Sequence, residues 1–108
     1  MDQYIEIQTT LPSREDAERL ARALLSRRLA ACVQISGPQA SLYWWSGATR
    51  EDTEWLCTAK TRGELYSRVE AAILGLHPYE TPQITAVDIT RGSAAYLAWI
   101  EKETATGG

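Results

Sequence analysis

Residues 31–45, ACVQISGPQASLYWW, restrict the fold of this chain more than any other stretch. The stretch is rich in residues of high β propensity, and Gly37-Pro38 interrupts it where a central strand could not lose an N–H donor. We therefore predict a long, bent strand. Because strands of small domains usually hold about 5 or 6 residues, this one must project beyond its own core.

The projecting end carries Tyr43, Trp44 and Trp45 in succession. Successive side chains of a strand point to opposite faces of a sheet, so a core on one side cannot bury all three rings. We predict that another copy of the chain covers them, because large aromatic residues are enriched at the cores of interfaces. The alternative is that the three rings belong to a two-sided core.

Length and charge limit the function classes. The 108 residues are enough for a single domain, 1–108, and the net charge of −3 provides no general attraction to nucleic acid or to an anionic membrane. No apolar run approaches the roughly 20 residues that cross a bilayer, and the N-terminal segment lacks the features of a signal peptide. We expect a cytoplasmic protein without nucleic-acid or membrane partners.

Periodicity and caps predict the remaining elements. Alternation predicts a first strand over 4–10 with Ile5 and Ile7 on one face, and Ser13 is the expected cap of a helix over 14–27. The elements expected after the long strand are a turn over 46–53, a strand over 54–60, a helix that starts at the Thr61/Glu64 capping box and stops at His77-Pro78, a strand over 83–88, a helix over 94–102 and a flexible tail over 103–108.

This order is β-α-β-β-α-β with a terminal helix, which is the ferredoxin-like arrangement. The predicted fold class is therefore α+β, a sandwich with a four-stranded antiparallel sheet and an extended hairpin formed by the second and third strands. Two helices on one face leave the other face of the sheet bare, in agreement with the expected oligomer.

Two cysteines, Cys32 and Cys57, fall in predicted strands. With the turn placed as above, Cys57 should face a residue near position 41, too far from Cys32 for a disulfide. We expect two free thiols that act as small buried apolar groups, with a metal or redox role as the alternative.

Several motifs together resemble one known family. ACVQI, SLYWWSG, the pair Lys60-Thr61, HPYETPQI and YLAWI occur in the order and spacing of the CutA-type divalent-cation-tolerance proteins, and the resemblance covers about residues 5–100. It implies a homotrimer of ferredoxin-like subunits, similar in build to PII signalling proteins, in which strands of neighbouring subunits pair edge to edge.

The resemblance also implies a connection with metal ions, and copper binding is associated with the family. Metal sites proposed for some members use a cysteine late in the first strand and two histidines that open the HPY segment. Here those positions hold Thr9, Leu76 and His77, so only His77 matches. We predict a weak site for copper or another divalent cation at His77 and Glu80, and expect that no cofactor is required for folding.

Two hypotheses follow from these residues. The first is a cytosolic homotrimer for divalent-cation tolerance with His77 and Glu80 as metal ligands; alternatively, His77 is a helix-end residue bonded to backbone and Glu80 solvates a loop. The second is a PII-like signalling or scaffold module whose clefts between subunits bind a small anionic ligand or a protein. These clefts would be lined by Lys60, Arg62, Tyr79 and Glu80. Lys60 could equally be a surface lysine, and Tyr79 a packing residue.

We predict that the chain is not an enzyme. It has a single histidine and neither a G-x-S-x-G motif nor a glycine-rich phosphate loop. An acylphosphatase on this fold would need an anion-binding loop after the first strand. The segment 10–13 has no glycine there, and Pro12 removes a donor.

Overall fold

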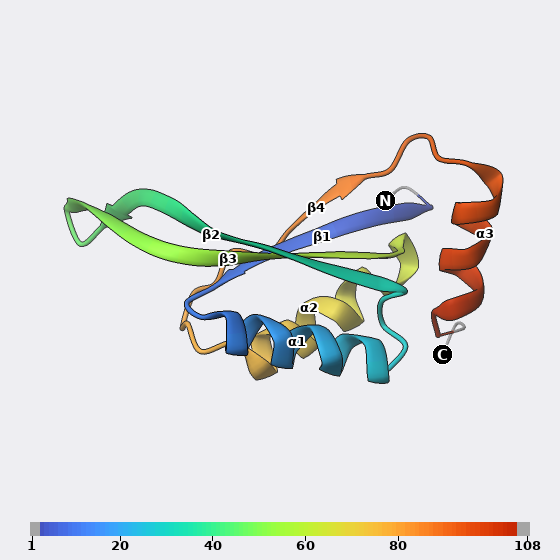
Figure 1. Ribbon diagram of the computed structural model, residues 1–108, viewed down its shortest axis with the longest axis horizontal. Helices are drawn as coiled ribbons and strands as arrows, with labels where there is room; N and C mark the ends of the chain where they lie inside the picture. Colours follow the sequence, from blue (N-terminus) through green and yellow to red (C-terminus); the bar gives the residue numbers. More distant parts are fainter. Residues whose placement is uncertain (1–2, 106–108) are drawn as a thin grey trace.

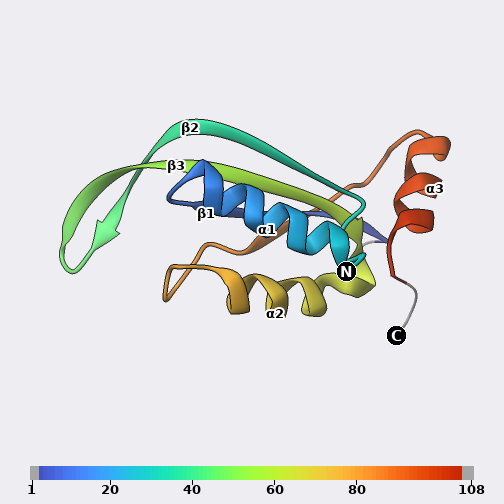
Figure 2. The ribbon, with the colours of Figure 1, turned by 60° about the horizontal axis from the view of Figure 1, so that its bottom comes forward.

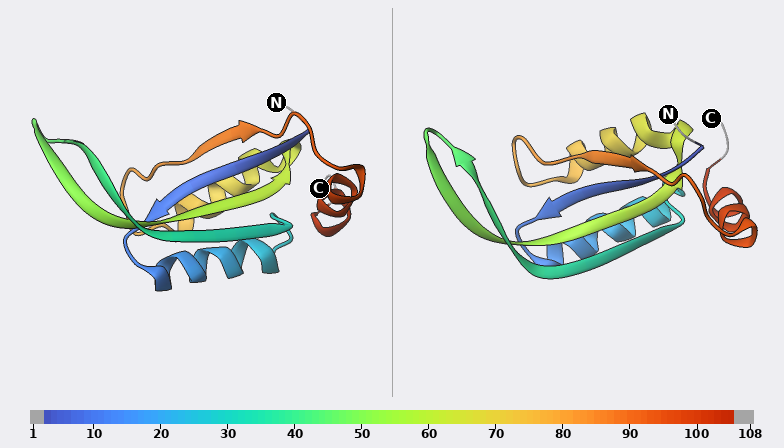
Figure 3. Two further views of the ribbon diagram at one scale, coloured as in Figure 1. Left: turned by 45° about the horizontal axis from the view of Figure 1, so that its top comes forward. Right: turned by 90° about the horizontal axis from the view of Figure 1, so that it is seen from above.

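A long antiparallel hairpin dominates the computed structural model, which describes residues 3–105 (Figure 1). Its strands are β2 (Cys32–Trp45) and β3 (Ala48–Arg62). The molecule measures 44 × 25 × 22 Å, and the closed end of the hairpin reaches well past the helices (Figure 3). The predicted projecting strand is confirmed.

The hairpin turn is shorter than predicted. Trp45 pairs with Ala48, so only Ser46 and Gly47 form the turn, and the expected turn over 46–53 is wrong. Both residues have positive φ, 51° and 78°, as in the two-residue turns that match the twist of a hairpin. In the observed register, Cys57 lies opposite Ile35 and not opposite a residue near 41. Both cysteines are free, as predicted.

The sheet has the order β2-β3-β1-β4, and every neighbouring pair is antiparallel. The expected α+β, ferredoxin-like class is confirmed. The other elements are β1 (Tyr4–Leu11), α1 (Arg14–Ser26), the short 3-10 helix η1 (Gly63–Leu65), α2 (Tyr66–Leu76), β4 (Thr85–Asp88) and α3 (Ala94–Glu103).

Helices α1 and α2 cover one face of the sheet, and α3 lies at the end opposite the hairpin turn (Figures 1 and 2). The core lies between the helices and the sheet and includes the predicted Ile5 and Ile7. Its other large members are Leu11, Leu20, Leu24, Leu65, Val69 and Ile73.

Local signals for helix ends are mostly confirmed. The Ser13 hydroxyl accepts a hydrogen bond from the Asp16 N–H, and α2 ends where His77 adopts an extended conformation before Pro78. The predicted capping box at Thr61 is wrong. Thr61 belongs to β3 and donates to the Leu29 carbonyl, because pairing with β1 continues through this position.

The expected tail is packed in its described part. Glu103 ends α3, and Thr104 is buried, where its hydroxyl accepts a hydrogen bond of 2.8 Å from Arg62 Nε. Residues 106–108 lie outside the described residues.

The predicted bend of β2 is confirmed by a register shift between Ser36 and Gln39. Gly37 has φ +147°, and a Cβ there would lie 3.0 Å from both the Glu54 carbonyl oxygen and the Trp55 ring. Gly37 is therefore required for β2 to bend closely over β3.

We predict that Gly37→Ala lowers the free energy of unfolding by about 2 kcal/mol, because alanine is strained at this φ and has no space. Gly75→Ala is the control. A Cβ at Gly75 meets nothing within 4 Å, so alanine in α2 should stabilise the protein by about 0.5 kcal/mol. Urea unfolding measures both changes, and equal effects would contradict this account of Gly37.

Candidate functional site

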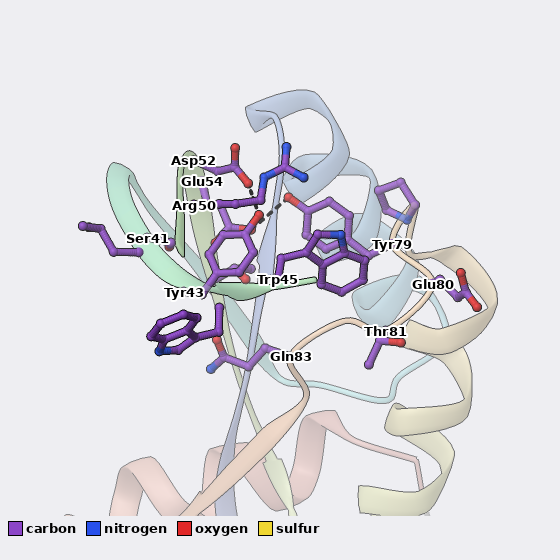
Figure 4. Close-up of a pocket in the computed structure, with 14 residues that line it drawn as sticks. Ser41, Tyr43, Trp45, Arg50, Asp52, Glu54, Tyr79, Glu80, Thr81 and Gln83 are labelled. Carbon is purple, nitrogen blue, oxygen red and sulfur yellow. Dashed lines mark hydrogen bonds between the residues drawn. The ribbon is translucent and has the colours of Figure 1, made fainter. Parts of the chain in front are cut away.

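The outer half of the hairpin and the segment 77–83 enclose a cleft of about 790 Å³, which we call the hairpin cleft (Figure 4). Small-molecule sites commonly measure roughly 300–1,000 Å³. Its lining residues are Thr10, Ser41, Leu42, Tyr43, Trp44, Trp45, Arg50, Asp52, Glu54, Pro78, Tyr79, Glu80, Thr81 and Gln83.

One wall of the cleft is fixed by a hydrogen bond between Tyr79 and Glu54. The Tyr79 hydroxyl donates to Glu54 Oε2 at 2.9 Å, and Glu54 is only 7% exposed. Burial, and then the bond to Glu54, raise the pKa of Tyr79, so its hydroxyl keeps its proton. The bond ties the segment 77–83 to β3.

A second tyrosine and carboxylate meet further along the hairpin. The Tyr43 hydroxyl donates to Asp52 Oδ2, and this bond is the main cause of the raised pKa of Tyr43. Arg50 lies directly opposite Tyr43 in the ladder. Because cross-strand neighbours share a face, Tyr43, Arg50 and Asp52 all belong to the wall that Glu54 continues.

His77 stands at the inner end of the segment with both ring nitrogens bonded to backbone. Nδ1 accepts from the Tyr79 N–H at 3.1 Å, so Nε2 is assigned the proton and donates to the Thr10 carbonyl at 2.8 Å. Burial lowers the pKa of His77 and keeps the ring neutral. This geometry is that of a helix-end histidine bonded to backbone, the alternative to a metal ligand.

The residues expected around His77 do not form a complete metal site within one copy. Within residues 3–105, no group of three or more His, Cys, Asp or Glu side chains could hold a metal ion. Glu80 is exposed, and Thr9 is buried on the helix side of β1. Burial raises the pKa of Cys57 to about 11, so its thiol stays protonated and is a poor metal ligand at neutral pH.

Lys60 and Arg62 lie far from Tyr79 in one copy. They occupy the other end of β3, six and eight residues beyond Glu54, which corresponds to roughly 20 and 26 Å along a strand. Lys60 Nζ lies 5.6 Å from the centre of the Tyr96 ring, and Arg62 is buried against Thr104 and Glu64. A cleft that contains Lys60, Arg62 and Tyr79 would therefore need two copies.

The three aromatic residues expected at an interface are exposed in a single copy. Trp44 is 74%, Trp45 53% and Tyr43 37% exposed, so these rings do not form a two-sided core within one chain. Their contact with a second copy stays a prediction.

Sequence reasoning missed Asp52 as a cleft residue because it assigned 46–53 to a turn, and it placed Glu54 at the start of a strand without a role in a site. The signal was present, since Asp52 and Glu54 are two positions apart and must share a face of any strand that contains them.

Comparisons with known proteins agree on one family. Residues 5–103 match the family model of the CutA1 divalent ion tolerance protein. The chain is 43% identical over 96 residues to the divalent-cation tolerance protein CutA of Archaeoglobus fulgidus, covering 89% of this chain and 93% of that protein. It is 40% identical to the CutA protein of Thermus thermophilus, covering 88% and 92%.

Solved structures give the same result. CutA1 from Oryza sativa superposes with a TM-score of 0.95 at 34% identity, covering 98% of this chain and 97% of that one. The structure described as the periplasmic divalent cation tolerance protein CutA of Archaeoglobus fulgidus has a TM-score of 0.90 at 41% identity, covering 93% and 97%.

None of the helices within 3–105 combines the length and apolar character of a membrane span.

The neutral state of His77 predicts a pH effect on stability. Because its folded-state pKa is below the ordinary value of 6.5, the unfolded chain binds the proton more readily than the folded chain in that interval. The stability due to neutral His77 is thus complete above about pH 6.5 and is lost as the pH falls below it.

We expect the melting temperature of the wild type to fall more between pH 7.5 and 5.5 than that of His77→Gln, which cannot titrate. Carboxylates titrate in both proteins, so the difference between the two falls isolates His77. Equal falls would show that His77 does not titrate differently in the folded and unfolded states.

Proposed function

Because the chain belongs to the family of CutA1 divalent ion tolerance proteins, we propose that it acts in divalent-cation tolerance as a homotrimer. The family resemblance implies three subunits. The observation that carries self-association is the hairpin itself, which projects past the core and exposes Leu42, Trp44 and Trp45. Monomeric proteins rarely expose several large apolar side chains so close together, and such groups of side chains commonly mark interfaces.

The bare face and edges of the sheet support the same proposal. Helices α1 and α2 cover one face, and α3 contacts the other face only at the end that holds Tyr4, Lys60 and Arg62. The edge strands are β2 and β4, and Val87 on β4 is half exposed. Unpaired edge strands invite association, and edge pairing between copies would protect them. A second copy therefore covers surfaces that one copy leaves open.

The proposed metal ligands are His77 and Glu80, with copper or another divalent cation as the ligand. A metal at His77 must displace the Tyr79 N–H from Nδ1 or the Thr10 carbonyl from the Nε2 proton. A transition metal generally needs three or four ligands, so one copy provides a weak site, and a tighter one requires ligands from neighbouring copies.

The alternative of a small anionic ligand has less support in the hairpin cleft. Its lining includes three carboxylates, those of Asp52, Glu54 and Glu80, and a single cation, Arg50. Arg62, one of the proposed anion-binding residues, is buried and already pairs with Glu64. A PII-like role would have to use surfaces that form only between copies.

The family name describes tolerance to ions and no reaction. We therefore keep a non-enzymatic role as part of the proposal. A cytoplasmic location is likewise part of the proposal.

We predict that native mass spectrometry and sedimentation will find a trimer, and that Leu42→Gln will weaken its assembly about tenfold or more. Leu42 shares a face of β2 with Trp44, and burial of a leucine side chain contributes roughly 1.5–3 kcal/mol. Leu74→Gln is the control, because Leu74 is an exposed leucine on α2, away from the hairpin. A monomeric wild type, or equal weakening by both variants, would overturn the proposed interface.

We predict that copper(II) binds the intact assembly with a dissociation constant weaker than about 1 µM, and that His77→Ala weakens binding at least tenfold. Calorimetry on a tag-free sample of measured oligomer mass tests this. Glu80→Gln should also weaken binding, whereas Glu51→Gln should not, because Glu51 is not among the residues that line the cleft. Unchanged affinity in His77→Ala would exclude His77 as a ligand.

A further inference from the structure

Glu54 is a buried carboxylate whose charge is not matched by a cation in its own copy. Within residues 3–105, the Tyr79 hydroxyl is its side-chain hydrogen-bond partner, and no Lys, Arg or His nitrogen lies within 4.0 Å of its carboxylate. A buried charge that only a neutral donor contacts is costly unless a counter-charge comes from outside.

Asp52 repeats this arrangement in the same cleft. It is half-buried, and its side-chain partner is the neutral hydroxyl of Tyr43. Arg50 lines the cleft but forms no ion pair with either carboxylate in the described part of the chain. Two of the three carboxylates that line the hairpin cleft, Asp52 and Glu54, are thus each held in place by a phenol and form no ion pair within the described residues.

The lining of the cleft favours an organic cation over a bare metal ion. The described residues provide no cluster of three or more metal-ligating side chains here, and each tyrosine occupies one carboxylate oxygen. Tyr43, Trp45 and Tyr79 contribute aromatic rings from both walls (Figure 4). Aromatic faces attract ammonium and guanidinium groups, and a guanidinium group can also bind a carboxylate through two parallel hydrogen bonds.

We propose that the hairpin cleft binds an alkylguanidinium or alkylammonium group, with Glu54 as the carboxylate that anchors it and the aromatic rings as its walls. The group can belong to a small organic cation in solution or to a lysine or arginine side chain of a second copy. The proposal goes beyond the role in metal tolerance, and it does not depend on copper binding at His77.

Glu54→Gln tests the proposal without removing the structural hydrogen bond, because a glutamine carbonyl oxygen can still accept from Tyr79. Without a ligand, this variant should melt at the same temperature as the wild type or higher, since it removes an uncompensated buried charge. Glu51→Gln is the matched control. It makes the same change three residues away on β3, on the opposite face of the hairpin.

The probe is methylguanidinium chloride, titrated at constant ionic strength while the indole N–H signals of the four tryptophans are followed by NMR. We expect a saturable shift of the Trp45 signal with a dissociation constant of about 1 mM, a value reasonable for so small a ligand. The affinity should fall at least tenfold in Glu54→Gln and stay unchanged in Glu51→Gln. Trp99 on α3 serves as an internal reference.

The oligomer mass of the same samples distinguishes the two sources of the cation. If the wild type does not bind the probe but Glu54→Gln, unlike Glu51→Gln, weakens assembly tenfold or more, a side chain of the second copy occupies the cleft. Probe binding that is equal in Glu54→Gln and the wild type overturns the proposal. So does the absence of both probe binding and any selective effect on assembly. A monomeric wild type would overturn the proposed trimer, yet the titration would still test the cleft.

Discussion

The pairing of β2 with β3 is the interaction on which the rest of the structure depends. The turn at Ser46-Gly47 is so tight that both strands stay paired up to the tip, far beyond the helices that cover the sheet. Apart from the bond between Tyr79 and Glu54, cross-strand neighbours are the main contacts of this outer half within the described residues, and an isolated two-stranded ribbon is marginally stable in water. The exposed tryptophans and the cleft both follow from that ladder, and so does the proposal that another copy covers the hairpin.

The segment 77–83 is the second constraint, because it joins three parts of the molecule. His77 bonds to the backbone of β1 through Thr10, Tyr79 bonds to Glu54 on β3, and the segment itself continues α2. Pro78 and Pro82 each fix a backbone dihedral angle, which reduces the entropy lost on ordering it. A displacement of the hairpin would therefore also displace the end of α2. A ligand between the hairpin and the segment 77–83 would contact both of them.

Features set by near neighbours in the sequence could be predicted, and features set by register could not. The Ser13 cap and the helix stop at His77-Pro78 depend on contacts within three or four residues, so the sequence displays them directly. The capping box at Thr61 has an equally good local pattern, but pairing with β1 is stronger and keeps Thr61 in a strand. The length of β3 was underestimated because its outer half is polar, and polar residues were interpreted as a turn although a Ser-Gly turn precedes them.

The same difference explains the prediction of the site. Aromatic residues at the hairpin tip are visible in the sequence because they are exceptional in composition. The hydrogen bond between Tyr79 and Glu54 joins residues 25 positions apart, and no local sequence pattern predicts it. Lys60 and Tyr79 were assigned to one cleft between subunits. Within one copy, Lys60 lies near one end of β3, whereas Tyr79 contacts the middle of this strand at Glu54.

The separation of those two ends bears on how copies can assemble. A twofold dimer joins a surface to the same surface, so it could cover either the hairpin or the β4 edge near α3 and would leave the other exposed. In a ring, two different surfaces of neighbouring subunits meet, so both surfaces are covered in every subunit. Because this chain has two unlike open surfaces, a cyclic trimer is favoured over a dimer. In such a ring the hairpin cleft, with Asp52 and Glu54, can face the end of a neighbour that holds Lys60 beside Tyr96. In the proposed ring, one copy would contribute the carboxylates of the cleft, and the next copy would contribute the groups that lie opposite them.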